Sequence, residues 1–468
     1  MQFPILTDRI IAYDTETTGL EYPKDRAFGF SVAMEGWSGY FDIRETPEAV
    51  RWINESRPAL VICHNASFDH KMSHSAGIHL PLERMDDTVI RACLLDEHLH
   101  SYSLDDLCWK YLRQKKQAEI YGDLAKLFGG IATRNVQMKN IHRAPSEVVA
   151  PYAIRDAELT LLLWKWQQEE IVRQGVEPII EFERRLMPTL IRAEMRGIRV
   201  DLEKAEAAQK DLTIEIDKQQ SEHNQQNGGS INVNSSPKIK ALFKPQLRDG
   251  GWYADNGCAL EKTESGNPSL DANALRSMEG DRRAELILGV RSLIKTRDTF
   301  LGGHVIKSAY EGRVYPNINQ NKGEDAGTGT GRLSYTAPAM QQIPSRNKKV
   351  ASIVKPVFLP EPGHIWVDAD MHSFEVRVFA HLVNDQFIVD KYAADPFSDF
   401  HQMVADMTGL PRNATYSGQA NAKQMNLSAI FNSGNGALAD KMGMPWSWES
   451  FTDNKGQSIT YKKAGPEA

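Results

Sequence analysis

The sequence predicts a multidomain protein of mixed α/β and α+β class, divided into residues 1–180, 181–310 and 311–468. The length of 468 residues suits three domains of ordinary size rather than one. In the first part, strand patterns alternate with helix patterns, whereas helical periodicity dominates the second. The third part carries strand-like segments, a strand-to-helix turn and further helices.

Composition narrows the class of protein. With 41% hydrophobic and 25% charged residues, the chain is typical of soluble globular proteins. No apolar run reaches the ~18 residues of a membrane span, and the N-terminus lacks a signal peptide, which predicts a cytoplasmic protein. The net charge of −6 requires any DNA binding to come from local basic surfaces. The cysteines have no zinc-binding spacing and are expected to be reduced and buried: Cys63, Cys93, Cys108 and Cys258.

Strands are expected at residues 9–15, 28–34, 39–43 and 59–63, with a helix beginning at the Thr46-Pro47 pair. Asp14 and Glu16 stand two residues apart at the end of the first strand, so their side chains point to one face. Asp69 follows the strand at 59–63. Tyr152 and Asp156 are four residues apart in the helical segment PYAIRDAELTLLLW and share a helix face.

Four carboxylates on separate elements have a chemical reason to converge. Hydrolysis of a phosphodiester by two metal ions needs oxygen ligands that hold the ions ~3.5–4 Å apart. The D-x-E pair, Asp69 and the Y-x-x-x-D pair together resemble the DEDD 3′–5′ exonucleases of the tyrosine type. This resemblance implies a ribonuclease-H-like fold in which Asp14 bridges two Mg²⁺ or Mn²⁺ ions. Glu16 and Asp156 then hold one ion, Asp69 steadies the other through water, and Tyr152 orients the attacking water.

Residues 181–310 are expected to be mainly helical. A helix ends at Gly197, and Asp201 can cap the next helix, which is expected to give way to an exposed polar loop within residues 218–236. Further helices are expected at 235–243 and 282–300, and residues 250–267 suggest a surface insertion to which no function is assigned.

Three motifs in the last part resemble the polymerase domain of family A DNA polymerases. The motif T-G-R-L-S…Q-x-I-P occurs at residues 330–344, D-x-x-x-x-E-x-R begins at Asp370, and a fingers-helix lysine occurs as Lys423. The resemblance therefore implies a helical thumb in residues 181–310 and an incomplete palm and fingers of a right-hand polymerase in residues 311–468.

The resemblance also implies roles for particular residues. Arg332 and Gln341 would contact the primer–template, and Asp370 would bind both catalytic metal ions. Asp368 is a rival because it lies on the same side of the expected strand at 365–370, but the five-residue spacing to Glu375 favours Asp370. Glu375 resembles the steric gate that excludes ribonucleotides, whereas Arg377 is expected to support packing.

On the expected fingers helix, Gln419, Lys423, Leu427 and Phe431 recur every four residues and form one face. Lys423 would give the incoming dNTP a positive partner for its triphosphate. Three positions depart from the family pattern, which has arginine in place of Gln419, an aromatic residue in place of Leu427 and tyrosine in place of Phe431. These departures put nucleotide affinity and fidelity in doubt.

Nothing after Asn432 resembles the family's His-Asp-Glu motif, whose aspartate completes the polymerase metal site. The sequence therefore predicts either a fragment or one half of a split, proofreading phage replicase that a second polypeptide completes. Single-stranded DNA, primer–template and dNTPs are the expected ligands, with a processivity factor possible. Two alternatives stay open: a stand-alone exonuclease that uses a polymerase remnant to hold DNA, and a non-catalytic DNA-binding or assembly subunit.

Overall fold

The structure is a computed structural model, and it describes 3–226, 232–248, 250–263, 265–278, 280–321, 327–345, 347–414, 419–442, 444–452 and 458–465. The chain divides into two compact units. The first comprises residues 1–221 and 290–364, and the second comprises residues 222–289 and 365–468. Each unit is described by itself below.

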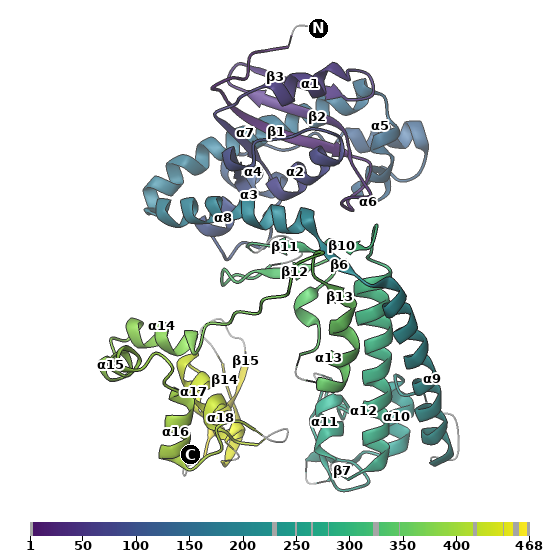
Figure 1. Cartoon of the computed structure of the whole chain (residues 1–468), viewed down its shortest axis with the longest axis vertical. Helices are drawn as coiled ribbons and strands as arrows, with labels where there is room; N and C mark the ends of the chain where they lie inside the picture. Colours follow the sequence, from purple (N-terminus) through teal and green to yellow (C-terminus); the bar gives the residue numbers. More distant parts are fainter. Residues whose placement is uncertain are drawn as a thin grey trace. The chain divides into compact units, whose positions relative to one another are not determined.

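A five-stranded sheet in the order β3-β2-β1-β4-β5 forms the centre of the first unit (Figure 1). Strand β1 pairs antiparallel with β2 and parallel with β4, and β5 extends the parallel side. The strands have these bounds: β1 Ile10–Thr17, β2 Ala27–Met34, β3 Trp37–Asp42, β4 Leu60–Cys63 and β5 Met85–Asp87. The four strands expected from the sequence are therefore confirmed, and β5 was not anticipated.

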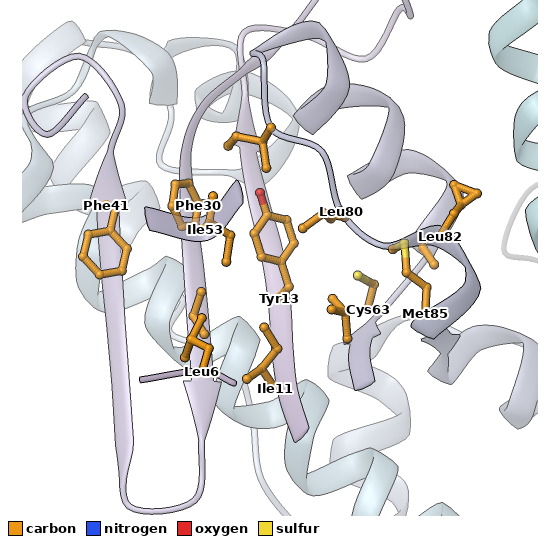
Figure 2. Close-up of a cluster of buried hydrophobic side chains, with 14 of the residues drawn as sticks. Leu6, Ile11, Tyr13, Phe30, Phe41, Ile53, Cys63, Leu80, Leu82 and Met85 are labelled. Atoms are coloured by element: carbon orange, nitrogen blue, oxygen red, sulfur yellow. The ribbon is translucent and has the colours of Figure 1, made fainter. Parts of the chain in front are cut away.

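Helices cover both faces of this sheet. On one face, apolar residues of β1, β2 and β4 meet Ala157 and Leu161 of α7. On the other face, a larger core contains Tyr13, Phe30 and Phe41, and helices α1, α2 and α8 add apolar side chains to it (Figure 2). These helices are α1 Glu48–Glu55, α2 Ala66–Ser75, α7 Ser146–Gln174 and α8 Glu177–Arg196. Burial on both faces explains why β2 and the first half of β1 are almost entirely apolar.

Shorter helices join the strands of the sheet to α7. They are η1 Leu82–Arg84, α3 Thr88–Leu95, α4 Leu104–Leu112, α5 Ile120–Phe128, α6 Arg134–Gln137 and η2 Met138–Arg143. Helix α4 begins at Ser103, whose side chain accepts a hydrogen bond from the backbone N–H of Asp106. Cys63, Cys93 and Cys108 are buried as free thiols, but Cys258 is partly exposed, so its expected burial is wrong. A polar neighbour, Ser277, lies 3.3 Å from the Cys258 sulfur and is consistent with that exposure.

Helix α8 ends at Gly197, where φ is +62° and a Cβ atom would come within 2.8 Å of the Val314 carbonyl oxygen. The chain then forms β6, the middle strand of a small sheet in the order β10-β6-β13. The remaining elements that lie wholly or partly in this unit are β6 Ile198–Val200, α9 Leu202–Gln226, α12 Arg282–Lys295, the π-helical η3 Thr296–Ile306, β10 Arg313–Val314, β11 Asn317–Asn319, β12 Ser334–Thr336, η4 Met340–Gln342, α13 Lys348–Val354, η5 Lys355–Val357 and β13 Phe358–Leu359.

Asp201 caps α9 as expected, because its carboxylate accepts the backbone N–H of Lys204 at 2.9 Å. The helix itself continues to Gln226. The prediction of an exposed polar loop is therefore wrong for residues 218–226. Gln219 and Glu215 join through a side-chain hydrogen bond one turn apart, which helps a polar segment remain helical. Residues 227–231 of that expected loop lie outside the described residues.

The second unit contains two groups of elements. The first has α10 Ser236–Phe243, β7 Gln246–Arg248, β8 Gly251–Tyr253, β9 Ala259–Leu260 and α11 Ala272–Ser277. The expected insertion at 250–267 thus supplies strands β8 and β9 of a small antiparallel sheet. The second group has α14 Phe374–Leu382, α15 Gln386–Ala394, α16 Phe400–Thr408, α17 Ala422–Ile430, α18 Asn435–Lys441, β14 Trp446–Thr452 and β15 Ser458–Ala464. Helices α14 and α15 share a small core with Ile430 of α17.

The prediction of a strand at residues 365–370 is wrong. This segment is extended chain without strand pairing, and Ile365, Trp366 and Val367 are 83%, 60% and 79% exposed. A strand needs a neighbouring strand to receive its backbone hydrogen bonds, and the sheets of the described residues do not include this segment. Across the described part of the chain, no helix is both long and apolar enough to cross a membrane.

Candidate active sites

Strand β1 delivers Asp14 and Glu16 to the sheet face covered by α7. Asp14 lines a cavity, whereas Glu16 is only 4% exposed. Burial, followed by repulsion from Asp156, raises the pKa of Asp14 to about 8. Burial also raises the pKa of Glu16, and the charges of Asp14 and Asp156 raise it further. These two carboxylates are therefore close enough to Asp156 to interact electrostatically.

Helix α2 delivers Asp69, which is 2% exposed. Asn65 immediately precedes this helix with a left-handed backbone, φ +83°, which turns the chain out of β4 into α2. One oxygen of Asp69 accepts the backbone N–H of Thr15 at 3.1 Å and its hydroxyl at 2.7 Å. Burial and the charge of Asp14 raise the pKa of Asp69.

Helix α7 delivers Tyr152 and Asp156 one turn apart, as expected. Both are buried, and burial followed by the charge of Asp156 raises the pKa of the Tyr152 hydroxyl. The Lys116 ammonium group lies 2.6 Å from Oδ2 of Asp156 and 5.7 Å from the centre of the Tyr152 ring. Oδ1 of Asp156 is buried without a hydrogen-bond partner.

These side chains lie at or beside a cavity of about 850 Å³. Its lining includes Asp14, Tyr152 and Lys116, and residues 317–321 of the β11 segment also belong to it. Positive groups (Lys115, Lys116 and Arg134) therefore share the cavity with the carboxylate cluster. An anionic chain end can enter such a cavity only if the charge of the carboxylates is neutralised.

A divalent cation would supply that neutralisation, and the donor set fits one. The carboxyl oxygens of Asp14, Glu16, Asp69 and Asp156 are the hard ligands that Mg²⁺ and Mn²⁺ prefer. Burial is the main cause of their raised pKa values, and repulsion between carboxylates adds to it at Asp14, Glu16 and Asp69. The unpartnered Oδ1 of Asp156 is a ready ligand. Nevertheless, no three His, Cys, Asp or Glu side chains within the described ranges form a closed metal-binding group.

The mutual electrostatic effects of the four carboxylates are consistent with their expected convergence, and the convergence leaves a direct ion pair in place of a closed ligand group among the described residues. Lys116 gives a physical reason, since it binds Asp156 directly and partly offsets the repulsion. Neither Lys116 nor Thr15, which fixes Asp69, was predicted from the sequence to belong to the site. Only the basic pair at 115–116 would have been a signal for Lys116 in the sequence.

The first unit also contains Arg332 and Gln341. Both are exposed, and Gln341 donates a hydrogen bond to the Leu333 carbonyl at 2.8 Å. This bond brings the two parts of the T-G-R-L-S…Q-x-I-P motif side by side. The Arg332 carbonyl accepts the Thr328 hydroxyl at 2.7 Å, which holds the turn before β12.

The second unit contains Asp370 and Glu375. Asp370 and its rival Asp368 are both exposed and lie four and six residues before α14, because the strand expected to carry both is not formed. Glu375 is partly buried in the first turn of α14. Arg377 supports packing as expected, since its guanidinium lies 4.1 Å from the centre of the Tyr392 ring and it donates to the His372 carbonyl at 2.9 Å.

The expected fingers helix is shorter than the four-residue pattern suggested. Helix α17 carries Lys423, which is exposed, and Leu427, which is partly buried. Gln419 precedes the N-cap of this helix, Asn421, and Phe431 follows its last residue and is 60% exposed. The prediction of one continuous helical face over all four positions is therefore wrong. Asn421 begins the helix by accepting the backbone N–H of Gln424, which excludes Gln419.

Comparison with known proteins matches both halves of the chain to families. Residues 5–171 match the family model described as 3′-5′ exonuclease, and residues 202–452 match the model described as DNA polymerase family A. Three phage proteins, each called DNA polymerase DpoZ, are similar over 98% of this chain, which covers 75% of each of them. Identities are 54% for Vibrio phage phiVC8, 47% for Salmonella phage PMBT28 and 46% for Acinetobacter phage SH-Ab 15497.

The fold is likewise similar to a solved structure. It matches the POL domain of Pol1 from M. smegmatis, solved in complex with DNA primer-template and dNTP, with a TM-score of 0.69 and 21% sequence identity. The match covers 93% of this chain and 70% of that one. At this identity the likeness concerns the fold alone.

Proposed function

The chain belongs to DNA polymerase family A and carries a 3′-5′ exonuclease domain; from this premise, we propose that its carboxylate cluster removes nucleotides from the 3′ end of DNA. We further propose that residues 1–180 form the exonuclease domain, 181–310 the thumb, and 311–468 part of the palm and fingers. The observation that carries the exonuclease proposal is the burial of Asp14, Glu16, Asp69 and Asp156 beside one cavity, where the charges of the other three all raise the pKa of Glu16.

In this proposal the carboxylates of Asp14, Glu16, Asp69 and Asp156 hold two Mg²⁺ or Mn²⁺ ions. Ions held there would supply polarisation of the scissile phosphate and stabilisation of the attacking and leaving oxygens. Tyr152 orients the attacking water through its hydroxyl, whose raised pKa keeps it protonated and able to donate. Thr15 holds Asp69 in its orientation through two hydrogen bonds.

The test is degradation of 5′-labelled single-stranded DNA by the purified chain with Mg²⁺. A ladder that shortens from the 3′ end is expected, and EDTA should stop it. The double variant Asp14→Ala/Glu16→Ala should lose at least about 10³-fold in rate, because it removes two metal ligands on one strand. Undiminished degradation by that variant would refute the assignment. Asp8→Asn, which changes an exposed carboxylate outside the cavity lining, serves as the control.

For the polymerase reaction we propose that Asp370 binds the catalytic metal ions and that Lys423 pairs with the triphosphate of the incoming dNTP. Glu375 acts as the steric gate, and Leu427 and Phe431 cover the nucleotide. Arg332 and Gln341 hold the primer–template; the hydrogen bond between Gln341 and the Leu333 carbonyl, beside Arg332, supports this pairing of motifs.

The chain would then work in phage DNA replication inside a bacterial host, as the phage origin of its relatives suggests.

We propose that this polymerase site is completed by residues outside the 468 of this sequence, on a continuation of the chain or on a second polypeptide. One carboxylate cannot fix two metal ions across a reacting phosphate. Asp368 is a poor substitute, since two residues of extended chain separate it from Asp370 by roughly 6–7 Å. This sequence covers 75% of each phage relative. The uncovered quarter of such a protein is long enough to carry a second carboxylate ligand for the metal ions.

Primer extension tests this proposal. The chain alone should extend no primer while its exonuclease works, and the addition of a polypeptide with a His-Asp-Glu palm segment should start synthesis. That synthesis should depend on both Asp370 and Lys423. Robust extension by the lone chain, lost in Asp370→Ala, would show that the site is complete. Failure of every mixture to extend would favour a stand-alone exonuclease, and loss of both activities a DNA-binding or assembly subunit.

A further inference from the structure

A buried ion pair joins α2, the helix that carries Asp69, to α8. The Lys71 ammonium lies 3.0 Å from Oε2 of Glu194, and the two side chains are 7% and 4% exposed. Removing both charges from water costs several kcal/mol per ion, so such a pair persists only when its partners are well placed. Within the described part of the chain, only Arg91–Asp86 is an equally buried ion pair.

The pair extends into a network that reaches β11. Lys71 also donates a hydrogen bond to Oδ1 of Asn317 at 2.9 Å. Glu194 accepts the backbone N–H of Ile318 through Oε1 and the hydroxyl of Ser67 through Oε2. One carboxylate and one ammonium therefore connect three elements that are distant in sequence: α2, α8 and β11.

The network lies in a wall of the cavity that Asp14 and Tyr152 also line. Lys71, Glu194 and residues 317–321 all belong to that lining. Beyond the network, Asn319 fixes β11 to β12, because its amide donates to the Ser334 carbonyl at 3.3 Å and to the Thr336 hydroxyl at 3.2 Å. Breaking the ion pair would release the β11 wall while leaving Asp69 held by Thr15.

We propose that Lys71 and Glu194 are positioning residues that hold the β11 wall of the cavity against the 3′-terminal single strand of DNA. This inference rests on the proposed exonuclease function. The network bonds to none of Asp14, Glu16, Tyr152 and Asp156. Its loss should therefore weaken binding of the strand and leave the bond-breaking step unchanged. In kinetic terms, KM rises and kcat stays the same.

The experiment compares two substrates in the variant Lys71→Met/Glu194→Gln, which removes both charges together and so leaves no unpaired buried ion. One substrate is a single-stranded DNA 12-mer, which spans the cavity. The other is the 4-nitrophenyl ester of thymidine 5′-monophosphate, which has one phosphodiester and no upstream nucleotides. We expect KM for the 12-mer to rise about fivefold or more with kcat within about twofold, and both constants for the ester to stay unchanged.

Two further variants separate positioning from general stability. Arg91→Met/Asp86→Asn removes the other equally buried ion pair, whose residues do not line the cavity, and should lower the melting temperature without changing KM. Asn317→Ala alters an exposed side chain of the wall, carries little risk of misfolding, and should raise KM for the 12-mer alone.

Three results would overturn the inference. If KM for the 12-mer is unchanged in both Lys71→Met/Glu194→Gln and Asn317→Ala, the network only stabilises the fold and does not position the DNA strand. A lower kcat on both substrates would instead mean that it acts on Asp69 and the metal site. A wild-type chain that cleaves neither substrate would refute the proposed exonuclease itself, and the inference with it, which distinguishes that failure from the other two.

Discussion

The ammonium group of Lys116 lies 2.6 Å from Oδ2 of Asp156, at the carboxylate cluster where the donor set fits a divalent cation. A lysine in this position can offset the repulsion among the carboxylates when no metal is bound, and it competes with a metal ion for Asp156. The two residues are 40 positions apart in the sequence, and nothing in the local pattern around either one predicts the contact.

Lys116→Met should therefore have opposite effects without and with metal. In EDTA the melting temperature should fall by about 2–4 °C, because the carboxylates lose their positive neighbour. The Mg²⁺ concentration that gives half-maximal thermal stabilisation should also fall, since a competitor and a repelling charge are both gone. A thermal-shift titration with Mg²⁺ measures both. Lys115→Met, at a lysine that also lines the cavity, is the control, and equal effects of the two variants would contradict the argument.

Asp14 makes the stability of the metal-free protein depend on pH. Its folded-state pKa, about 8, exceeds its ordinary value of 3.8, so the folded state binds a proton that the unfolded state releases. The resulting stability is complete below about pH 3.8 and is lost as the pH rises through 8. Asp14→Asn should consequently be more stable than the wild type at pH 8–9 in EDTA, and this advantage should shrink toward pH 4. Urea unfolding across that range tests the sign, with Asp8→Asn as the control.

The apolar core opposite α7 depends on Phe30, which is fully buried and whose ring centre lies 5.5 Å from that of Tyr13 and 5.4 Å from that of Phe41. Phe30→Ala should lower the free energy of unfolding by about 3–5 kcal/mol, through lost burial and the cavity left behind. Phe182→Ala is the matched control, because that side chain is 60% exposed and should cost little. Denaturant unfolding of both variants measures the difference; equal losses would place the core elsewhere.

Glu375 gives a prediction about sugar selection. If its side chain crowds the position of a ribose 2′-hydroxyl, Glu375→Ala in a complete, active polymerase should accept ribonucleotides more readily. We expect the ratio of kcat/KM for dNTP over rNTP to fall by about tenfold or more. Single-nucleotide incorporation with each substrate gives this ratio. If the variant discriminates as well as the wild type, Glu375 is not the steric gate.

Sequence patterns predicted those features that depend on local spacing. The alternation in β1 gave the shared face of Asp14 and Glu16, and the helical spacing in α7 gave that of Tyr152 and Asp156. Contacts such as Lys116–Asp156 and Lys71–Glu194 escaped prediction because they join residues 40 and 123 positions apart. The expected strand at 365–370 failed for a related reason: its apolar residues are suited to a strand, but strand pairing requires a partner segment.

Strand β1 serves two purposes at alternate positions. Ile11 and Tyr13 pack into the large core, as Figure 2 shows, while Asp14 and Glu16 point the other way. A scan of all substitutions, scored separately for cellular abundance and for nuclease activity, should therefore resolve the strand into two interleaved sets. Substitutions at positions 11 and 13 should lower the cellular abundance of the protein. Polar substitutions at positions 14 and 16 should leave its abundance unchanged and abolish its nuclease activity. A single-residue deletion before Asp14 would exchange the two sets and lose both properties at once.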